Sequence, residues 1–176
     1  MVDINKFKQE FLRIKSLGFL ESDRPLSQKN DGAVGNTFET NLGVQENNLK
    51  APDYDGWEIK TKRQFTKSAT SLFTLKPSYP PNGDKYMREN WGLNDPSGEY
   101  PNIKVFRTSV YANRFSIVYQ KYQMKLYLDR DSKKLRLLLH DINKKIIDDK
   151  VYWSFDDILK ASSKLRNLLV IEANEK

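Results

Sequence analysis

The chain has 176 residues and no cysteine. It is long enough to bury a hydrophobic core, and it lacks disulfides, thiolate nucleophiles and cysteine-based metal sites. Its 30 Lys and Arg residues outnumber its 23 Asp and Glu residues, giving a net charge of +7. Polyanions are therefore the expected partners, with nucleic acid ahead of an anionic membrane surface. The N-terminus is charged and no apolar run is long enough for a signal peptide or a membrane span, so we expect a cytoplasmic protein with no membrane association.

Two helices are predicted in the first part of the chain. Apolar residues at helical spacing predict a helix over residues 3–17, which Gly18 ends. A four-residue repeat of apolar side chains predicts a short second helix over residues 34–42, closed by Gly43. Glu39 lies on this second helix, beside its apolar stripe.

Apolar and charged residues alternate over residues 57–63, WEIKTKR, which predicts a β-strand. Trp57 and Ile59 are expected to face the core. Because side chains alternate across a strand, Glu58 and Lys60 are expected to project together from the opposite face.

The remaining elements follow from similar patterns and from turn residues. Residues 71–75 predict a strand, and residues 76–102, rich in Pro, Gly and aromatic residues, predict a long irregular loop. Ser154 and Asp157 resemble a capping box for a helix from Phe155 to about Leu165. Further strands are predicted over residues 115–119, 123–129, 135–140 and 167–173. The order of elements predicts one α/β or α+β domain over residues 1–176, with a mixed β-sheet flanked by helices.

The candidate catalytic residues form one motif: Asp53, four intervening residues, then Glu58, Ile59 and Lys60. Hydrolysis of a phosphodiester requires neutralised charge on the phosphorus oxygens and a positioned water. Two carboxylates can hold Mg²⁺, a hard cation that prefers oxygen ligands. An ammonium group on the same strand face can orient the attacking water and stabilise the developing charge.

This spacing alone is not specific. At this content of Asp, Glu and Lys, it is expected by chance in roughly one such chain in five. The alternative interpretation is a solvated surface strand that displays alternating charges.

The wider segment, residues 32–77, resembles the active-site region of the MvaI/BcnI family of restriction endonucleases. That family is related to the mismatch-repair nicking enzyme MutH, and its members share the PD-(D/E)xK nuclease fold. Glu39 lies fourteen residues before Asp53, a spacing typical of this family. The matching residues are Gly35–Glu39, Leu42–Val44, Glu46–Asn48, Pro52–Asp53, Gly56–Lys60, Ser71–Thr74 and Pro77.

The resemblance implies a role for each matching residue of the centre. Asp53 and Glu58 are metal ligands, and the backbone carbonyl of Ile59 is a further ligand. Lys60 is the catalytic lysine, and Glu39 holds either Lys60 or a water on the metal from the neighbouring helix. The implied cofactor is Mg²⁺.

The resemblance also implies a function: a type II restriction enzyme that cuts double-stranded DNA at a short specific sequence and leaves 5′-phosphate ends. The alternatives are a MutH-like repair nickase and a DNA-binding module of the same fold that has lost catalysis. We expect a monomer, as in that family. Family members continue past the final strand, so this chain is a minimal member, a fragment or a domain of a larger protein.

Several charged residues outside the core motif have two interpretations. Asp55 is either a second carboxylate of the centre or a simple turn residue. The single histidine, His140, is expected to be structural. Five basic residues are candidates for contact with DNA phosphates, with solvated surface charge as the alternative. These are Lys62, Arg63, Lys76, Lys85 and Arg88.

Overall fold

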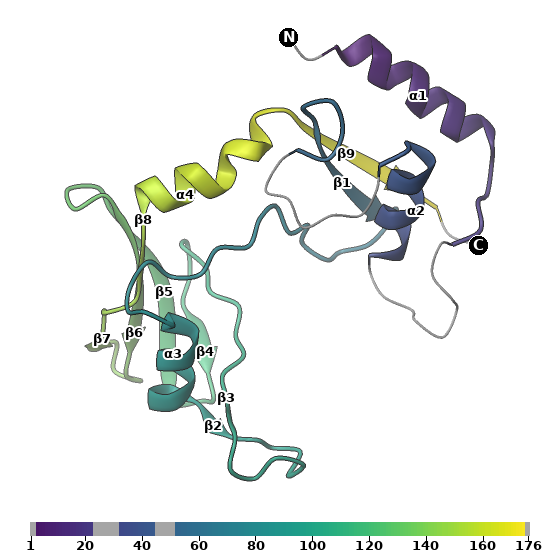
Figure 1. The fold of residues 1–176 in the computed structure, drawn as a ribbon. Coiled ribbons are helices and arrows are strands. Elements are labelled where there is room, and N and C mark those ends of the chain that lie inside the picture. The colour runs from purple at the N-terminus through teal and green to yellow at the C-terminus, as the bar shows by residue number, and fades with distance from the viewer. Residues whose placement is uncertain (1–2, 23–31, 45–51, 175–176) are drawn as a thin grey trace. The chain divides into compact units, whose positions relative to one another are not determined.

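The computed structural model describes residues 3–22, 32–44 and 52–174 (Figure 1). Contacts within the chain divide it into two compact units. Unit 1 comprises Met1–Phe73 and Ser162–Lys176, and unit 2 comprises Thr74–Ala161. The single endonuclease domain over residues 1–176 stays a prediction.

Unit 1 combines two helices with a parallel pair of strands. The helices and strands predicted from the sequence in this unit are confirmed, apart from residues 71–75. Gly18 and Gly43, the predicted helix ends, have φ angles of +75° and +79°, a conformation that glycine adopts without strain. The elements are α1 (Ile4–Ser16), α2 (Ala33–Asn41), β1 (Glu58–Arg63), the 3₁₀ helix η2 (Ser163–Arg166) and β9 (Leu168–Ala173).

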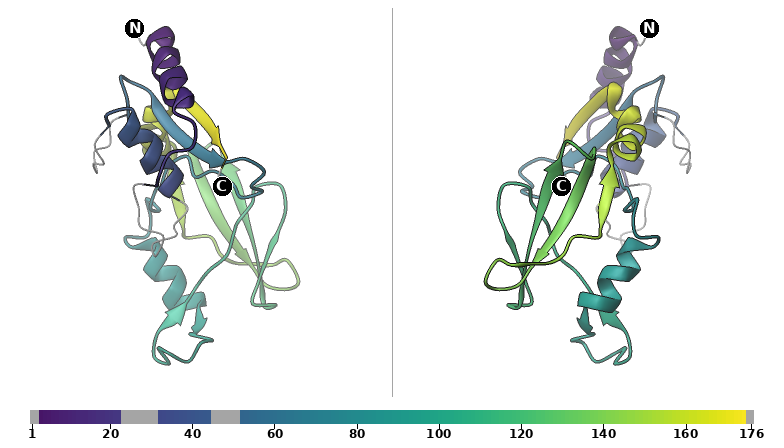
Figure 2. Two further views of the ribbon diagram at one scale, coloured as in Figure 1. Left: turned by 90° about the vertical axis from the view of Figure 1, so that its right-hand side faces the viewer. Right: turned by 90° about the vertical axis from the view of Figure 1, so that its left-hand side faces the viewer.

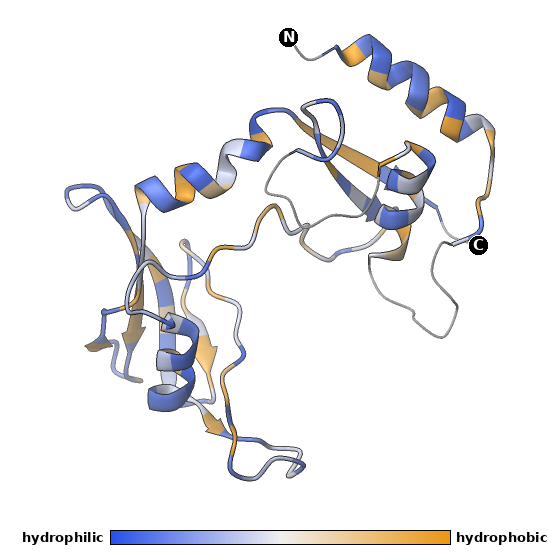
Figure 3. Cartoon of the chain, viewed as in Figure 1, coloured by the Kyte–Doolittle hydropathy of each residue, from blue (hydrophilic) through white to orange (hydrophobic). Residues whose placement is uncertain are grey.

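Strands β1 and β9 run side by side, as Figures 1 and 2 show, with Glu58 paired to Leu168 and Arg63 to Ala173. Strand β9 is largely apolar, whereas α1 alternates apolar and charged residues along its length (Figure 3). One apolar cluster joins the two helices to β1. Its buried members are Phe7, Ile14, Phe38, Leu42 and Ile59.

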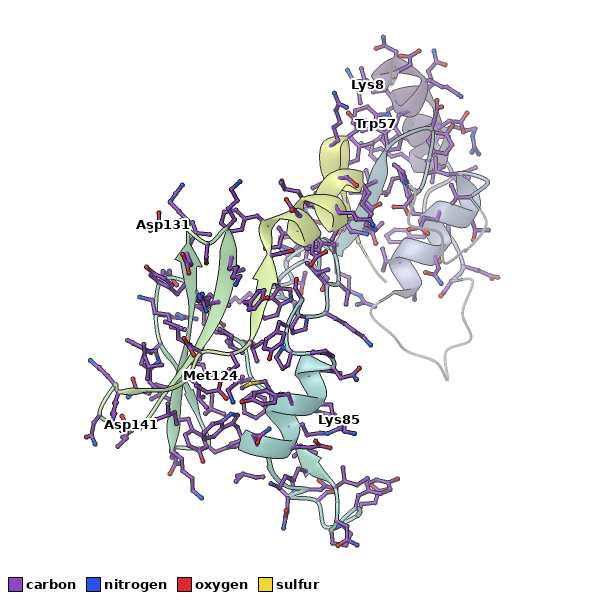
Figure 4. The ribbon with its side chains drawn as sticks, turned by 60° about the vertical axis from the view of Figure 1, so that its left-hand side comes forward. Lys8, Trp57, Lys85, Met124, Asp131 and Asp141 are labelled. Atoms are coloured by element: carbon purple, nitrogen blue, oxygen red, sulfur yellow. The ribbon has the colours of Figure 1, made fainter. Side chains whose placement is uncertain are left out.

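Unit 2 is built on an antiparallel sheet with the strand order β4-β5-β6-β7, in which β8 also pairs with β6. Met124 of β5 lies in its core (Figure 4), where it is 1% exposed. The predicted strands over residues 115–119, 123–129 and 135–140 are confirmed. The elements of the sheet are β4 (Ser116–Val118), β5 (Tyr122–Asp129), β6 (Lys134–His140), β7 (Ile146–Asp148) and β8 (Tyr152–Ser154).

Helix α4 (Phe155–Ser162) follows β8 and begins at the predicted capping box. The Ser154 hydroxyl accepts a hydrogen bond from the Asp157 N–H at 3.1 Å and donates one to the Asp157 carboxylate at 2.7 Å. The first bond satisfies an N–H that the first helical turn leaves without a partner, and the Ser154 N–H donates to the Ser78 hydroxyl at 2.9 Å instead of to Asp157. Hydrogen bonds from Ser78 and Ser154 lower the pKa of the Asp157 carboxyl.

The long loop predicted over residues 76–102 is wrong in part. The segment contains α3 (Gly83–Trp91) and β2 (Leu93–Asn94), which pairs with β3 (Lys104–Val105). The helix forms because Met87 packs into the apolar core and Gly83 is buried against Pro77, a tertiary effect that overrides the local Pro and Gly signals.

The strand predicted over residues 71–75 is also wrong. These residues have no strand assignment. The Leu75 carbonyl accepts a hydrogen bond from the Trp153 indole at 3.1 Å, so a side chain takes the place that a neighbouring strand would have.

The α/β fold class is confirmed. Among the described residues, the parallel and antiparallel strands belong to separate sheets. No helix in this part of the chain is long and apolar enough to cross a membrane.

Asp148 joins α3 to the sheet of unit 2. Its carboxylate is buried and accepts hydrogen bonds from the Tyr86 hydroxyl at 2.6 Å and the Trp91 indole at 2.8 Å. Burial and then the hydrogen bond to Asp148 raise the pKa of Tyr86 to about 12. The protonated Tyr86 hydroxyl therefore stabilises the folded protein. Its contribution is complete below the unfolded pKa of tyrosine, near 10, and is lost as the pH rises towards 12.

We predict that Asp148→Ala lowers the free energy of unfolding by roughly 1–3 kcal/mol, because it leaves the half-buried donors of Tyr86 and Trp91 without an acceptor. Asp149→Ala is the matched control, since the Asp149 side chain is 60% exposed. The control is expected to change stability by less than about 0.5 kcal/mol. Denaturant unfolding followed by circular dichroism measures both. Equal losses in the two variants would contradict the assigned role of Asp148.

Candidate active site

A tight turn brings Asp53 next to the start of β1. Tyr54 and Trp57 exchange backbone hydrogen bonds of 3.0 and 2.7 Å across it. The two residues between them, Asp55 and Gly56, have φ angles of +45° and +83°, as a two-residue hairpin turn of the Asp-Gly type requires. The four residues between Asp53 and Glu58 are therefore the hairpin turn itself.

The turn folds Asp53 back onto the strand. The Asp53 Oδ2 atom accepts a hydrogen bond of 2.8 Å from the backbone N–H of Ile59. Ile59 is 2% exposed and packs into the apolar cluster of unit 1. The carboxylate of Asp53 is thereby bound to the buried start of β1, beside the residue that carries the second carboxylate.

Glu58 has a buried carboxylate with two positive neighbours. Its side chain is 0% exposed. The Oε1 atom lies 2.6 Å from Lys60 Nζ and 2.6 Å from Lys164 Nζ. Neither Glu58 oxygen has an aligned hydrogen-bond donor among the described residues, so both contacts are ion pairs without hydrogen-bond geometry.

The burial of Glu58 excludes the interpretation of residues 57–63 as a solvated strand with alternating charges. A buried carboxylate requires compensating positive charge. Lys60 supplies it from the same strand face, as the alternation predicted. Lys164 also supplies it, from η2, and this residue is not among those predicted from the sequence. No local signal marks it, since it lies 106 positions further along the chain.

Glu39 lies on α2, one turn after Gly35. A Cβ atom on Gly35 would lie 2.9 Å from Thr61 Oγ1 of β1 and 3.9 Å from Glu39 Oε1. The glycine therefore allows α2 to approach β1 closely. The Glu39 carboxylate lies beside this contact between helix and strand.

The carboxylates of Asp53 and Glu58 are the candidate ligands for Mg²⁺. Glu58 Oε2 is buried and has no donor among the described residues. No three His, Cys, Asp or Glu side chains of that part of the chain form a group that could hold a metal ion. Mg²⁺ nevertheless binds through one or two carboxylates together with water and substrate phosphates. Asp53, Glu58 and the Ile59 carbonyl are oxygen donors of the kind that such a site uses.

Asp55 is a turn residue in this structure. Its carboxylate is paired with Lys6 Nζ at 3.1 Å, and its side chain is 48% exposed. His140 is buried in unit 2, with its ring edge-on to Phe115 at 5.1 Å between centroids. This packing agrees with the structural role predicted for the histidine.

The five candidate DNA-contacting residues are divided between the units. Lys62 and Arg63 continue β1 beyond Lys60 in unit 1. Lys76, Lys85 and Arg88 belong to unit 2. Lys85 projects from α3 (Figure 4) and lies 3.6 Å from Glu89 one turn along the helix. Contact of these residues with DNA stays a prediction.

Comparisons with known proteins find similarity over almost the whole chain. The model of the MvaI/BcnI restriction endonuclease family matches residues 6–176. A solved complex of restriction endonuclease MvaI with cognate DNA matches with a TM-score of 0.85 and 32% identity, over 98% of this chain and 67% of that one. MvaI without DNA matches with a TM-score of 0.57 and 31% identity, over 92% of this chain and 61% of that one. No match was found among curated proteins.

We predict that Gly35→Ala destabilises the protein by about 1–3 kcal/mol, because the added Cβ overlaps Thr61 Oγ1. In a Thr61→Ala background the same substitution is expected to be neutral or stabilising, since alanine has the higher helix propensity. Denaturant unfolding of the wild type, both single variants and the double variant forms a complete cycle. An equal effect of Gly35→Ala in both backgrounds would show that the contact does not limit the approach of α2.

Proposed function

The chain belongs to the MvaI/BcnI restriction endonuclease family and so to the type II site-specific deoxyribonucleases, and we propose that it hydrolyses double-stranded DNA with Mg²⁺ at the centre formed by Asp53, Glu58 and Lys60. The observation that carries this proposal is the buried Glu58 carboxylate, held at 2.6 Å from Lys60 on the strand that follows the Asp53 turn. The centre lies within unit 1. The proposed products carry 5′-phosphate and 3′-hydroxyl ends.

Asp53, Glu58 and the Ile59 carbonyl are the proposed metal ligands. Mg²⁺ bound there neutralises charge on the phosphorus oxygens. The hydrogen bond from the Ile59 N–H orients the Asp53 carboxylate before any cation arrives. Burial fixes the Glu58 side chain in the same way. Preorganisation of this kind reduces the reorganisation that the site needs during the reaction.

Lys60 is the proposed catalytic lysine. Its ammonium group lies at the Glu58 carboxylate and is 24% exposed, so solvent reaches it. An ammonium in this position orients the attacking water and stabilises the negative charge that develops on the phosphate. Glu39, on the helix that packs against β1, is proposed to hold Lys60 or the attacking water in place.

The proposed partner is duplex DNA in the cytoplasm. The printed name of one structural neighbour describes MvaI in complex with cognate DNA, and the net charge of +7 suits binding to a polyanion. Lys62 and Arg63, next to the centre on β1, are proposed to contact phosphates beside the scissile one.

We predict that Asp53→Asn abolishes Mg²⁺-dependent cleavage of plasmid DNA, because it removes a charged metal ligand but preserves the shape of the side chain. Lys60→Ala is expected to slow cleavage at least about a hundredfold, equivalent to about 2.7 kcal/mol. Binding to DNA in Ca²⁺, measured by mobility shift, should persist in both variants, since the positive surface provides most of the affinity.

Asp55→Asn is the matched control for Asp53→Asn. It makes the same chemical change two residues away, at an exposed carboxylate paired with Lys6, and asparagine tolerates the positive φ of this turn position. The control is expected to cleave at close to the wild-type rate. Cleavage by Asp53→Asn at the wild-type rate, or its equal loss in both variants, would refute the proposed centre.

We predict a monomer in solution and a nicked-circle intermediate during digestion of supercoiled plasmid. One catalytic centre acts on one scissile phosphate at a time, whereas a symmetric dimer places two centres on the duplex together. Sedimentation measures the mass, and a digestion time course shows the order of the cuts. A stable dimer that linearises plasmid without a nicked intermediate would contradict the prediction and leave the chemistry of the centre untouched.

A further inference from the structure

Lys164 contacts the candidate metal ligand Glu58, although the family resemblance assigns it no role. Its ammonium group lies 2.6 Å from Glu58 Oε1, the same oxygen that Lys60 approaches at 2.6 Å. The three side chains together carry a net charge of +1. A single ammonium balances the charge of one carboxylate, so the second ammonium stabilises the buried Glu58 further and leaves the cluster with one excess positive charge.

The position of Lys164 is fixed by the backbone around it. The Glu58 N–H donates a hydrogen bond of 2.8 Å to the Asn167 carbonyl, and the Asn167 side chain donates one of 3.2 Å to the Gly56 carbonyl. These bonds attach the junction of η2 and β9 to the start of β1. Lys164 is three residues before Asn167 on this attached segment, so its approach to Glu58 follows from the parallel pairing of β1 with β9.

A divalent cation and Lys164 are both attracted to the Glu58 carboxylate. Glu58 is the proposed ligand whose side chain is fully buried. Lys164 Nζ lies 2.6 Å from Oε1, and its positive charge repels a divalent cation at the buried Oε2 atom of the same carboxylate. Lys60 belongs to the same strand as Glu58, whereas Lys164 approaches from a separate segment and is 26% exposed, so its flexible side chain can withdraw towards solvent.

We propose that Lys164 is a counter-ion of the Glu58 carboxylate in the metal-free protein and moves away when a divalent cation binds that carboxylate. It is a positioning residue, because it holds Glu58 in place and opposes premature metal binding. The inference rests on the proposed metal-dependent function. It predicts effects of opposite sign: loss of Lys164 weakens the metal-free fold and strengthens metal binding.

The test measures Mn²⁺ binding to the complete chain without DNA, by electron paramagnetic resonance, and thermal unfolding in EDTA. Lys164→Gln and Lys164→Met are expected to bind Mn²⁺ about fivefold more tightly than the wild type, because a positive charge beside the site is removed. Both are expected to have a lower Tm in EDTA than the wild type, and a smaller difference in Tm when Mn²⁺ is saturating.

Arg166→Gln is the matched control. Arg166 lies on the same 3₁₀ helix, is exposed, and has no ion pair among the described residues. The substitution removes the same net charge without touching Glu58, and the Mn²⁺ affinity should stay within about twofold of the wild type. An equal gain in affinity for Arg166→Gln would show that the change in net charge alone accounts for the effect of the Lys164 variants, and would overturn the proposal.

Glu58→Gln separates this inference from the proposed function. If the wild type binds Mn²⁺ and Glu58→Gln does not, unchanged or weaker binding by the Lys164 variants overturns only the role of Lys164. If Mn²⁺ binding does not depend on Glu58, both the metal centre and this inference are wrong. Lys164 variants that fail to fold with or without Mn²⁺ would show a structural residue and would also overturn the proposal.

Discussion

The candidate site depends on the burial of one carboxylate, that of Glu58. An isolated carboxylate in a protein interior costs several kcal/mol, so its surroundings have to supply positive charge. Here the charge comes from Lys60 on the same strand and Lys164 on a distant segment. The parallel pairing of β1 with β9 brings these side chains together, so the charged centre requires the small sheet.

Local patterns predicted the part of the site that is close together in sequence. Period-two alternation placed Glu58 and Lys60 on one strand face, and the ion pair between them agrees with it. The Asp-Gly pair between Asp53 and β1 is a strong hairpin signal, and it accounts for the spacing of the two carboxylates. The helix that carries Glu39 followed from its apolar repeat and its terminal glycine.

The unpredicted features depend on contacts between distant segments. Lys164 is an ordinary lysine near a helix end, and only the register of β1 with β9 brings it to Glu58. Asp148 likewise stabilises α3 through Tyr86 and Trp91, which are more than fifty residues away. The apolar pattern of residues 71–75 suited a strand, but a strand also needs a neighbour with free backbone groups. The Leu75 carbonyl instead accepts a hydrogen bond from the Trp153 indole.

Stability and chemistry in this centre are connected through the same charges. The ion pairs that compensate the buried Glu58 stabilise the metal-free protein. The same ammonium groups oppose the binding of a divalent cation to the Glu58 carboxylate. A neutral residue at position 58 would remove the ligand and leave two ammonium groups facing each other. A neutral residue at position 60 or 164 would leave the carboxylate with one positive neighbour. The carboxylate and its lysines therefore constrain one another, which explains why the site lies on paired strands rather than on a mobile loop.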